Sequence, residues 1–489
     1  MKSLVLPILL LGLLHGGAAA KGGPEKKHDE PWMTALKQSP ACLVWEKPYL
    51  GVGISSPRLA DLNGDGIKDI ALGTDLRGNL NVLAISGSDG TQLWEASVNS
   101  IMVGTGIFSF VNADPVPDFI IGTHRGFRLK YLDIKAFDGT NGSLLWSLRR
   151  ENSAADLPDS NFNSLCPTRD LDGDGIVDLV VVQAGGIDDE FDELPGWDDS
   201  KRLAGRIHFI SPVSGKILKT FVSFDGKESY CTPAVMQNGD VIVGSGGETV
   251  PGHLARLSFD NENPVWAVPS KEKGFESSPF VYTFDDELGE DIVAANMDGD
   301  HLRLDGDTGD VLWRFSQPGY ECTASPAPGL FNGSPGMDVV GAVTQGVFPD
   351  YNQAAHLIWL DGKTGALIAR MNYGKQISAS LLTIDLDMDG YHEVVVITNF
   401  SYNLEREGIS SELAILDGRT REFLFRHPMN SMTVATPVID DVDSDGTLDL
   451  ILVTAGIIKR FALNHHPAAK PLWNQFRGPD ENGFLRPGS

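Results

Sequence analysis

Four short segments place oxygen-bearing side chains at positions 1, 3, 5 and 9 of a glycine-containing loop. Carboxylates and carbonyl oxygens are the hard ligands that Ca²⁺ prefers, and the residue at position 7 can add its backbone carbonyl. The pattern therefore predicts about four bound Ca²⁺ ions. The candidate ligands are Asp61, Asn63, Asp65, Ile67 and Asp69; Asp170, Asp172, Asp174, Ile176 and Asp178; Asp385, Asp387, Asp389, Tyr391 and Glu393; and Asp441, Asp443, Asp445, Thr447 and Asp449.

Strands, not helices, are expected after these loops. An EF-hand loop begins in the same way, but it carries a bidentate Glu at position 12 and continues as a helix. Here position 12 is Leu72, Val181, Val396 or Leu452, inside apolar runs that are typical of buried strands. The segments therefore predict calcium loops within a β fold. The alternative is that these Asp-Gly clusters only form turns.

The elements that must position the loops repeat along the chain. Each loop and its strand are followed by a second strand, an Asp-Gly turn and a third strand that often ends in Trp, as in residues 80–94 and 134–146. Eight such units of about four strands match the blades of a β-propeller. We expect an all-β fold with a single eight-bladed propeller over residues 41–478, seven blades being the alternative. Residues 43–45 and residues 472–473 both qualify as the strand that completes the last blade.

The first residues resemble an export signal. Lys2 precedes an apolar run from Leu4 to Leu14, and Ala18 to Ala20 form a small-residue cleavage site. We therefore expect a signal peptide over residues 1–20, a flexible leader over 21–40 and a C-terminal tail over 479–489. No later segment is apolar for long enough to span a bilayer. The mature protein is expected to be secreted, or periplasmic or on the cell surface in a bacterium.

The net charge and the cysteine content argue against several classes of function. A formal net charge of −27 argues against nucleic acid as a partner. The chain has four cysteines and no Cys-x-x-Cys motif, which argues against a zinc or redox role. A bridge between Cys166 and Cys231 would join neighbouring units. Buried thiols along the central channel are the alternative.

The other four units lack an intact calcium loop. The second has prolines within residues 112–118, the fourth keeps only residues 237–240, and the sixth has Pro335 within residues 332–338. The fifth, residues 285–291, retains the most acid. We expect no metal in any of the four.

Two known repeats are similar to these units. The loop Asp-x-Asp/Asn-x-Asp-Gly-x-x-Asp resembles the FG-GAP repeat of the integrin alpha-subunit propeller. The ending Asp-Gly-x-Thr-Gly-x-x-Leu-Trp is similar to the repeats of pyrroloquinoline quinone-type propellers, which have eight blades. The resemblance implies a calcium-stabilised propeller used for adhesion or ligand binding, usually without catalysis. Half of the units depart from it by lacking the loop.

Long insertions indicate which face carries function. In a four-stranded blade, the calcium loops and the Asp-Gly turns share one face, and the remaining connections lie on the other. The insertions at residues 149–161, 184–204, 345–355 and 399–411 all fall on this second face. We expect it to bind an extracellular protein or glycan. Residues 188–199 are strongly acidic and include Trp197, so they form either a docking arm or a solvated loop.

No catalytic motif is evident. Gly-x-Ser-x-Gly, a phosphate-binding loop and His-Glu-x-x-His are all missing from the sequence. The adjacent Cys-Cys pair found in many quinone-dependent dehydrogenases is also missing. We therefore expect the chain not to be an enzyme. The alternative is a calcium-dependent polysaccharide lyase, for which Arg169 and Lys375 are the candidate basic residues.

Overall fold

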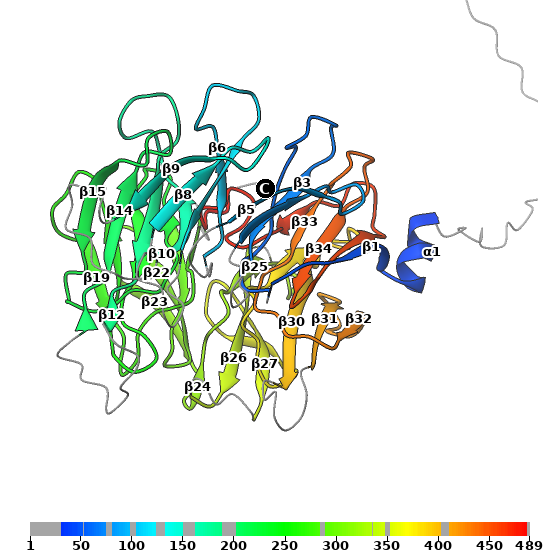
Figure 1. Ribbon diagram of the computed structural model, residues 1–489. Helices are drawn as coiled ribbons and strands as arrows, with labels where there is room; N and C mark the ends of the chain where they lie inside the picture. Colours follow the sequence, from blue (N-terminus) through cyan, green and yellow to red (C-terminus); the bar gives the residue numbers. More distant parts are fainter. Residues whose placement is uncertain are drawn as a thin grey trace, which may run out of the picture.

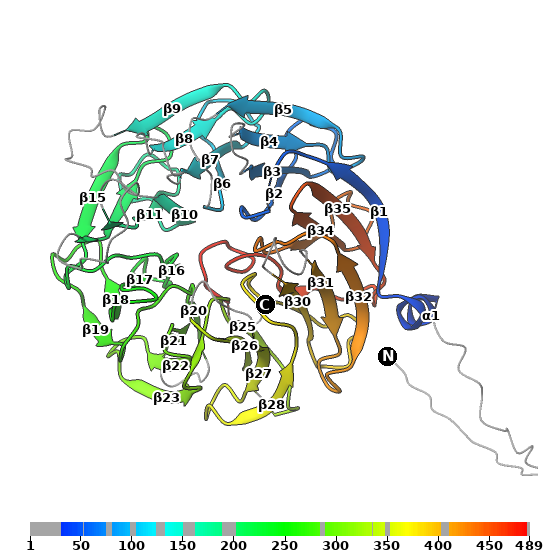
Figure 2. The same ribbon diagram turned by 60° about the horizontal axis from the view of Figure 1, so that its bottom comes forward.

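Eight antiparallel sheets are arranged as blades around a ring in the computed structural model (Figures 1 and 2). It describes residues 31–51, 53–74, 81–97, 104–123, 133–149, 162–187, 202–283, 289–334, 336–347, 353–401 and 410–486. The single helix among these residues is α1 (Pro31–Gln38), and no described helix has the length and hydrophobicity of a membrane span. The prediction of an all-β propeller with eight four-stranded blades is confirmed.

Blades I to IV follow one another in chain order, and in each the first strand is innermost. Blade I consists of β2 (Arg58–Ala60), β3 (Asp69–Gly73), β4 (Asn81–Ile85) and β5 (Gln92–Ser97), and blade II of β6 (Ile107–Ser109), β7 (Asp118–Gly122), β8 (Asp133–Phe137) and β9 (Leu144–Arg149). Blade III consists of β10 (Phe162–Pro167), β11 (Leu179–Gln183), β14 (Arg206–Ile210) and β15 (Ile217–Val222), with an additional hairpin of β12 (Gly186–Ile187) and β13 (Arg202–Leu203). Blade IV consists of β16 (Ala234–Val235), β17 (Val241–Gly244), β18 (His253–Leu257) and β19 (Trp266–Pro269).

Blades V to VIII repeat the arrangement and add short edge strands. Blade V consists of β20 (Phe280–Tyr282), β21 (Asp291–Ala295), β22 (Asp300–Asp305) and β23 (Val311–Ser316). Blade VI consists of β25 (Ala327–Gly329), β26 (Asp338–Gln345), β27 (Ala355–Leu360) and β28 (Leu367–Asn372), with β24 (Tyr320–Glu321) beside β26. Blade VII consists of β29 (Leu382–Ile384), β30 (Glu393–Ser401), β31 (Ser410–Leu416) and β32 (Phe423–Met429), and blade VIII of β33 (Val438–Asp440), β34 (Asp449–Thr454), β35 (Ile457–Leu463) and β1 (Ala41–Pro48).

The N-terminal strand closes the ring. β1 pairs with β35 from Ala41 opposite Leu463 to Pro48 opposite Ile457, so the fourth strand of the last blade comes from the start of the chain. The competing candidate, β36 (Pro471–Trp473), instead pairs with β29 on the inner edge of blade VII. Closure by β1 gives blade VIII its fourth strand, so β35 is not left as an unpaired edge.

The C-terminal segment after β36 lies within the ring (Figure 2). Asn474 exchanges hydrogen bonds with Ile439 of blade VIII, and Gln475 accepts one from Arg58 of blade I. The backbone of residues 482–485 then bonds to Val235 of blade IV and Val281 of blade V. The residues expected to form a tail therefore tie together blades on opposite sides of the ring.

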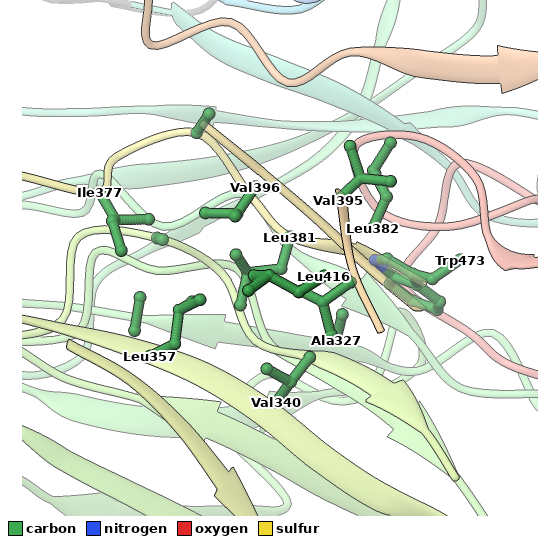
Figure 3. Close-up of a cluster of buried hydrophobic side chains, with 14 of the residues drawn as sticks. Ala327, Val340, Leu357, Ile377, Leu381, Leu382, Val395, Val396, Leu416 and Trp473 are labelled. Atoms are coloured by element: carbon green, nitrogen blue, oxygen red, sulfur yellow. The ribbon is translucent and has the colours of Figure 1, made fainter. Parts of the chain in front are cut away.

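The core consists of apolar layers between neighbouring blades. The largest spans blades V to VIII and buries Trp359 and Trp473 completely or nearly so (Figure 3). The second strands are the most buried elements, because both of their faces contact other blades. This explains their continuous apolar sequence, since a strand covered on both faces shows no polar alternation.

In five blades, a tryptophan on the fourth strand fastens the blade to the next one. The indole N–H of Trp94 donates to the carbonyl of Gly139 at 2.7 Å, and its ring lies against Gly142, where a Cβ atom would come within 2.6 Å of the indole. The repeated Thr-Gly of the Asp-Gly turn therefore provides the surface on which the preceding blade's indole rests. Equivalent bonds are made by Trp45 to Gly87, Trp146 to Pro212, Trp266 to Gly306 and Trp313 to Gly362.

Candidate metal centres

The four predicted calcium loops connect the first and second strands of blades I, III, VII and VIII. Position 1 lies directly after the first strand in blades I, VII and VIII, as Asp61 does after β2, and three residues after it in blade III. Position 9 lies at or one residue before the start of the second strand, as Asp69 and Asp178 do. The amide of Gly87, in the turn between β4 and β5, donates to Asp69 at 3.2 Å. The calcium loops and the Asp-Gly turns therefore share one face, as expected.

Backbone amides hold each loop around its carboxylates. In the loop of blade III, Asp170 accepts bonds from the amides of Gly173 at 2.7 Å and Gly175 at 3.0 Å. Asp174 accepts the amide of Ile176, and Asp178 accepts the amide of Leu171 at 2.6 Å. The same bonds recur with Asp61, Asp385 and Asp441 at position 1. The position-7 carbonyls remain predicted ligands.

Loops III and VII bring the position-9 acid close to two other carboxylates. In each, three ligand atoms lie within 4.8 Å of one another: those of Asp170, Asp172 and Asp178, and those of Asp385, Asp387 and Glu393. Asp178 is fully buried, and its Oδ1 atom has no hydrogen-bond partner. A buried carboxylate oxygen without a partner is costly unless a cation meets it. The donor set therefore fits Ca²⁺. The described residues of loop I, which has Asn63 at position 3, do not place three carboxylates this close.

Burial makes the charge at position 9 unfavourable without a metal. It raises the pKa of Asp178 to about 6, and the neighbouring carboxylates of Asp172 and Asp174 add to the effect. Burial likewise raises the pKa of Glu393 to about 8 and that of Asp69. A divalent cation would reverse the direction of these shifts, because it stabilises the ionised carboxylate.

Blades without an intact loop retain the acid at the start of the second strand, and in blades II and VI an asparagine amide meets it. Asn112 Nδ2 donates to Asp118 at 3.3 Å, and also to Asp138 in the adjacent turn. Asn332 Nδ2 bonds to Asp338 and Asp361 in the same way, both at 3.1 Å. A neutral donor thus occupies the place beside this acid that a cation would take in the calcium loops.

In blades IV and V an arginine from the third strand meets the acid. Arg256 lies 2.7 Å from Asp240, and Arg303 lies 2.6 Å from Asp291. Both arginines occupy the same position of the third strand. Arg256 lies opposite Ile242 and Arg303 lies opposite Val293, and each of these partners is two residues after the acid of its blade. These guanidinium groups supply the positive charge from within the chain. Residues 284–288 of the fifth unit lie outside the described residues.

Blade VIII combines both arrangements. Arg460 occupies the same register position and contacts Asp449 at 2.8 Å and Asp443 at 2.5 Å. The close cluster in this loop is formed by Asp441, Asp443 and Asp445, without the position-9 acid. Arg460 therefore competes with a metal ion for two of the predicted ligands, which distinguishes this loop from the other three.

The remaining predicted residues lie apart from these centres. All four cysteines are free, and Cys166, Cys231 and Cys322 are buried, so the bridge considered between Cys166 and Cys231 is absent. Arg169 pairs with Asp260 at the surface rather than lining a central funnel. Lys375 follows β28, where its amide bonds to Asn399. The acidic residues 188–199 and most of the other insertions lie outside the described residues.

The fold and these centres together define a class, the eight-bladed β-propeller with clusters of acidic residues in some of its loops. No family model and no curated protein sequence matches the chain, so the FG-GAP resemblance remains a resemblance of the loops. Solved structures do match. BamB from Moraxella catarrhalis shares 14% identity at a TM-score of 0.51, over 87% of this chain and 98% of that one.

Dehydrogenases are among the similar structures. A europium-containing methanol dehydrogenase matches with 11% identity and a TM-score of 0.58, over 87% of this chain and 94% of its own. Quinohemoprotein alcohol dehydrogenase from Comamonas testosteroni matches with 13% identity and a TM-score of 0.56, over 88% and 78%. These matches support the similarity to quinone-type propellers. At such identities they show the fold alone.

Our expectation that the chain is not an enzyme is contradicted by these comparisons. It rested on missing motifs and on the usual role of FG-GAP propellers, whereas the similar structures include methanol and alcohol dehydrogenases. The fold therefore gives no reason to exclude catalysis, and sequence motifs taken from other enzyme folds were the wrong test.

Proposed function

We propose that the protein is an exported propeller whose fold is stabilised by Ca²⁺ and which binds an extracellular protein or glycan on the face opposite its calcium loops. The observation that carries the calcium assignment is Asp178, which is fully buried beside Asp170 and Asp172 with one oxygen unpartnered. Ca²⁺ would supply the charge that this group of carboxylates lacks. Its binding energy would add to folding energy.

The binding face is proposed from the blades that extend furthest. On the side away from the calcium loops, blade III carries the β12–β13 hairpin, and blade VI carries β24 beside an eight-residue β26. β30 in blade VII is longer still, at nine residues. In Figure 1 the labelled strands β24, β26 and β27 reach the lower edge of the molecule. Such extensions exceed what the propeller requires, and connections of this kind often carry binding residues.

Thermal unfolding in excess Ca²⁺ and in chelator tests the calcium proposal. At a free concentration 100 times the dissociation constant, each site adds about 2.7 kcal/mol to stability. Asp172→Ala should remove most of the contribution from loop III and one bound ion, as counted by elemental analysis. Asp114→Ala in blade II, whose loop lacks the ligand set, is the matched control and should leave the calcium dependence unchanged. Equal melting temperatures with and without Ca²⁺ would refute the proposal.

Partner binding is tested separately from stability. We expect Asp172→Ala, assayed below its melting temperature in Ca²⁺, to retain binding to any partner captured by the wild-type protein, because the loop lies on the other face. Lys375→Ala, at the base of the elongated blades, should weaken that binding and leave the melting temperature almost unchanged. If Asp172→Ala abolishes binding while the protein remains folded, the partner contacts the calcium face instead.

A further inference from the structure

The junction between blades III and IV is one of three that lack a tryptophan on the fourth strand. In the fourth strand of blade III, the position held by Trp94 in blade I and Trp146 in blade II is Lys219. Its ammonium donates to the carbonyls of Phe259 and Asn261 in blade IV and lies 4.6 Å from the centre of the Phe221 ring. A narrow alkyl chain therefore replaces a broad indole between these blades.

A cavity of about 300 Å³ lies at this junction. Blade III contributes Ile207 and Phe221, and blade IV contributes Val243, Ala255 and Leu257. The blade IV residues alternate along β17 and β18, so they belong to the face turned toward blade III. The volume is at the lower end of those found for small-molecule sites.

One end of the cavity carries an oriented histidine. Asp225 is buried and accepts hydrogen bonds from Ser223 Oγ and Ser245 Oγ, both at 2.6 Å, and from the Lys227 amide. Its Oδ2 atom lies 2.8 Å from His253 Nδ1. These bonds outweigh the effect of burial and lower the pKa of Asp225. The carboxylate is therefore ionised and holds the imidazole proton on Nδ1.

The free nitrogen of this histidine is available to a ligand. When Nδ1 carries the single ring proton, Nε2 is a hydrogen-bond acceptor. Among the described residues, no hydrogen bond is made to Nε2, and about a third of the side chain is exposed. The Phe224 ring meets the imidazole edge-on at 5.1 Å, and Phe224 is itself 48% exposed at the rim.

The remaining polar lining indicates the charge of the ligand. Glu262 is exposed and belongs to the lining, and no lysine or arginine does. The nearby ammonium of Lys219 is held outside the lining by the carbonyls of Phe259 and Asn261. A carboxylate and an imidazole acceptor in an otherwise largely apolar lining match a small apolar body that carries a hydrogen-bond donor with positive charge. We propose that the cavity between blades III and IV binds a small aromatic or short-chain amine, with its ammonium on His253 Nε2.

Three ligands with one ring test the assignment on the full chain in Ca²⁺: benzylamine, benzyl alcohol and benzoate. Binding is followed by NMR of the histidine ring nitrogens. We expect benzylamine to shift the His253 signals and to bind about tenfold or more tightly than benzyl alcohol, since hydrogen bonds to charged groups are the stronger ones. Benzoate should not bind. Preference for benzoate, or no shift with any of the three, would overturn the proposal.

Variants separate the pocket from the fold. His253→Gln should weaken benzylamine binding about tenfold, whereas His427→Gln, remote from the cavity, should not. Phe224→Ala, at the exposed rim, should weaken binding without lowering the melting temperature. Ala255→Leu fills the cavity, so it should block binding in a protein at least as stable as the wild type. Unchanged benzylamine affinity in folded Ala255→Leu would place the ligand elsewhere.

Discussion

At the scale of the residue, every blade begins its second strand with a buried acid, and the chain neutralises that acid in different ways. Blades II and VI use an asparagine amide, and blades IV and V use an arginine. In loops I, III and VII, the proposed cation would neutralise this acid. Because leaving a buried carboxylate uncompensated is costly, each blade that lost its calcium loop shows a replacement donor.

Arg460→Gln tests this substitution of arginine for metal. Removing one partner of a buried ion pair costs about 3–5 kcal/mol, so the variant should be strongly destabilised in chelator. In Ca²⁺, Asp443 and Asp449 become available as ligands, and much of the lost stability should return. Urea unfolding with and without Ca²⁺ measures the difference, and elemental analysis should find one more tightly bound ion than in the wild-type protein.

Arg256→Gln is the matched control, because blade IV has the arginine and the acid but no calcium loop. It should be destabilised to a similar extent, and Ca²⁺ should restore nothing. An unchanged ion count in Arg460→Gln would mean that the loop of blade VIII already holds its metal beside the arginine.

The acidic residues of the four candidate loops can be recognised in the sequence, but the arginines that meet the equivalent acid in other blades cannot. The 1, 3, 5, 9 spacing identifies loops III and VII directly. Asn112 lies in the loop itself, six residues before Asp118. Arg256 carries no local signal, because its role depends on a strand partner across the blade. Only alignment of the third strands by register, which places Arg256, Arg303 and Arg460 at one position, would have revealed these arginines.

At the scale of the element, the fourth strand determines how firmly neighbouring blades are joined. Trp45, Trp94, Trp146, Trp266 and Trp313 each donate to a carbonyl of the next blade. Blade III has Lys219 instead, blade VI has Ala369, and blade VII has Phe425. The junctions therefore differ although the blades repeat, and the cavity beside β15 lies at one that lacks the indole.

Trp94→Phe should weaken one of the fastened junctions. It keeps an aromatic ring against Gly142 but leaves the Gly139 carbonyl without its indole donor. We expect a loss of about 1–3 kcal/mol in unfolding free energy, measured by urea unfolding in Ca²⁺. Trp32→Phe in α1, outside the blades, should cost far less. Equal losses would show that the indole bond contributes little.

The order and number of the strands could be predicted because each unit repeats its pattern. Which strand completes the last blade could not. Residues 43–45 and 472–473 are both short apolar segments that end in Trp, and only the pairing of β1 with β35 separates them. The pairing of two strands that are several hundred residues apart cannot be inferred from the local periodicity of either strand.

At the scale of the whole molecule, buried histidines tie stability to pH. Burial lowers the pKa of His208 to about 3 and that of His301 to about 4. Below pH 6.5 the unfolded chain takes up protons at these residues and the folded chain does not, so this contribution to stability is lost as pH falls from about 6.5 toward 4.

His208→Gln should reduce that loss. Its effect on stability is measured by urea unfolding in Ca²⁺ at pH 8, where the histidine is neutral in both states, and again at pH 5. Between these values the variant should lose less stability than the wild type, by about 1.4 kcal/mol for each pH unit below 6.5. The carboxylates are common to both proteins, so the effect of their titration on stability cancels in the comparison. Parallel pH profiles would show that His208 does take up a proton in the folded state.

The position of the C-terminal segment was the least predictable part of the fold. Residues 474–485 have no strand pattern, yet they bond to blades on several sides of the ring. Arg58 is fully buried there and reaches Gln475 and Glu481. Contacts of this kind depend on the finished ring and therefore cannot be inferred from any single unit.

Closure by β1 has a consequence for how the protein is made. β1 leaves the ribosome first, but its partner β35 is separated from it by more than 400 residues, from Pro48 to Ile457. Blade VIII therefore cannot be finished during most of translation, and β1 must remain available while seven other blades form. The pairing of β1 with β35 is therefore expected as a late step of folding, and until that step the edges of both strands are unpaired.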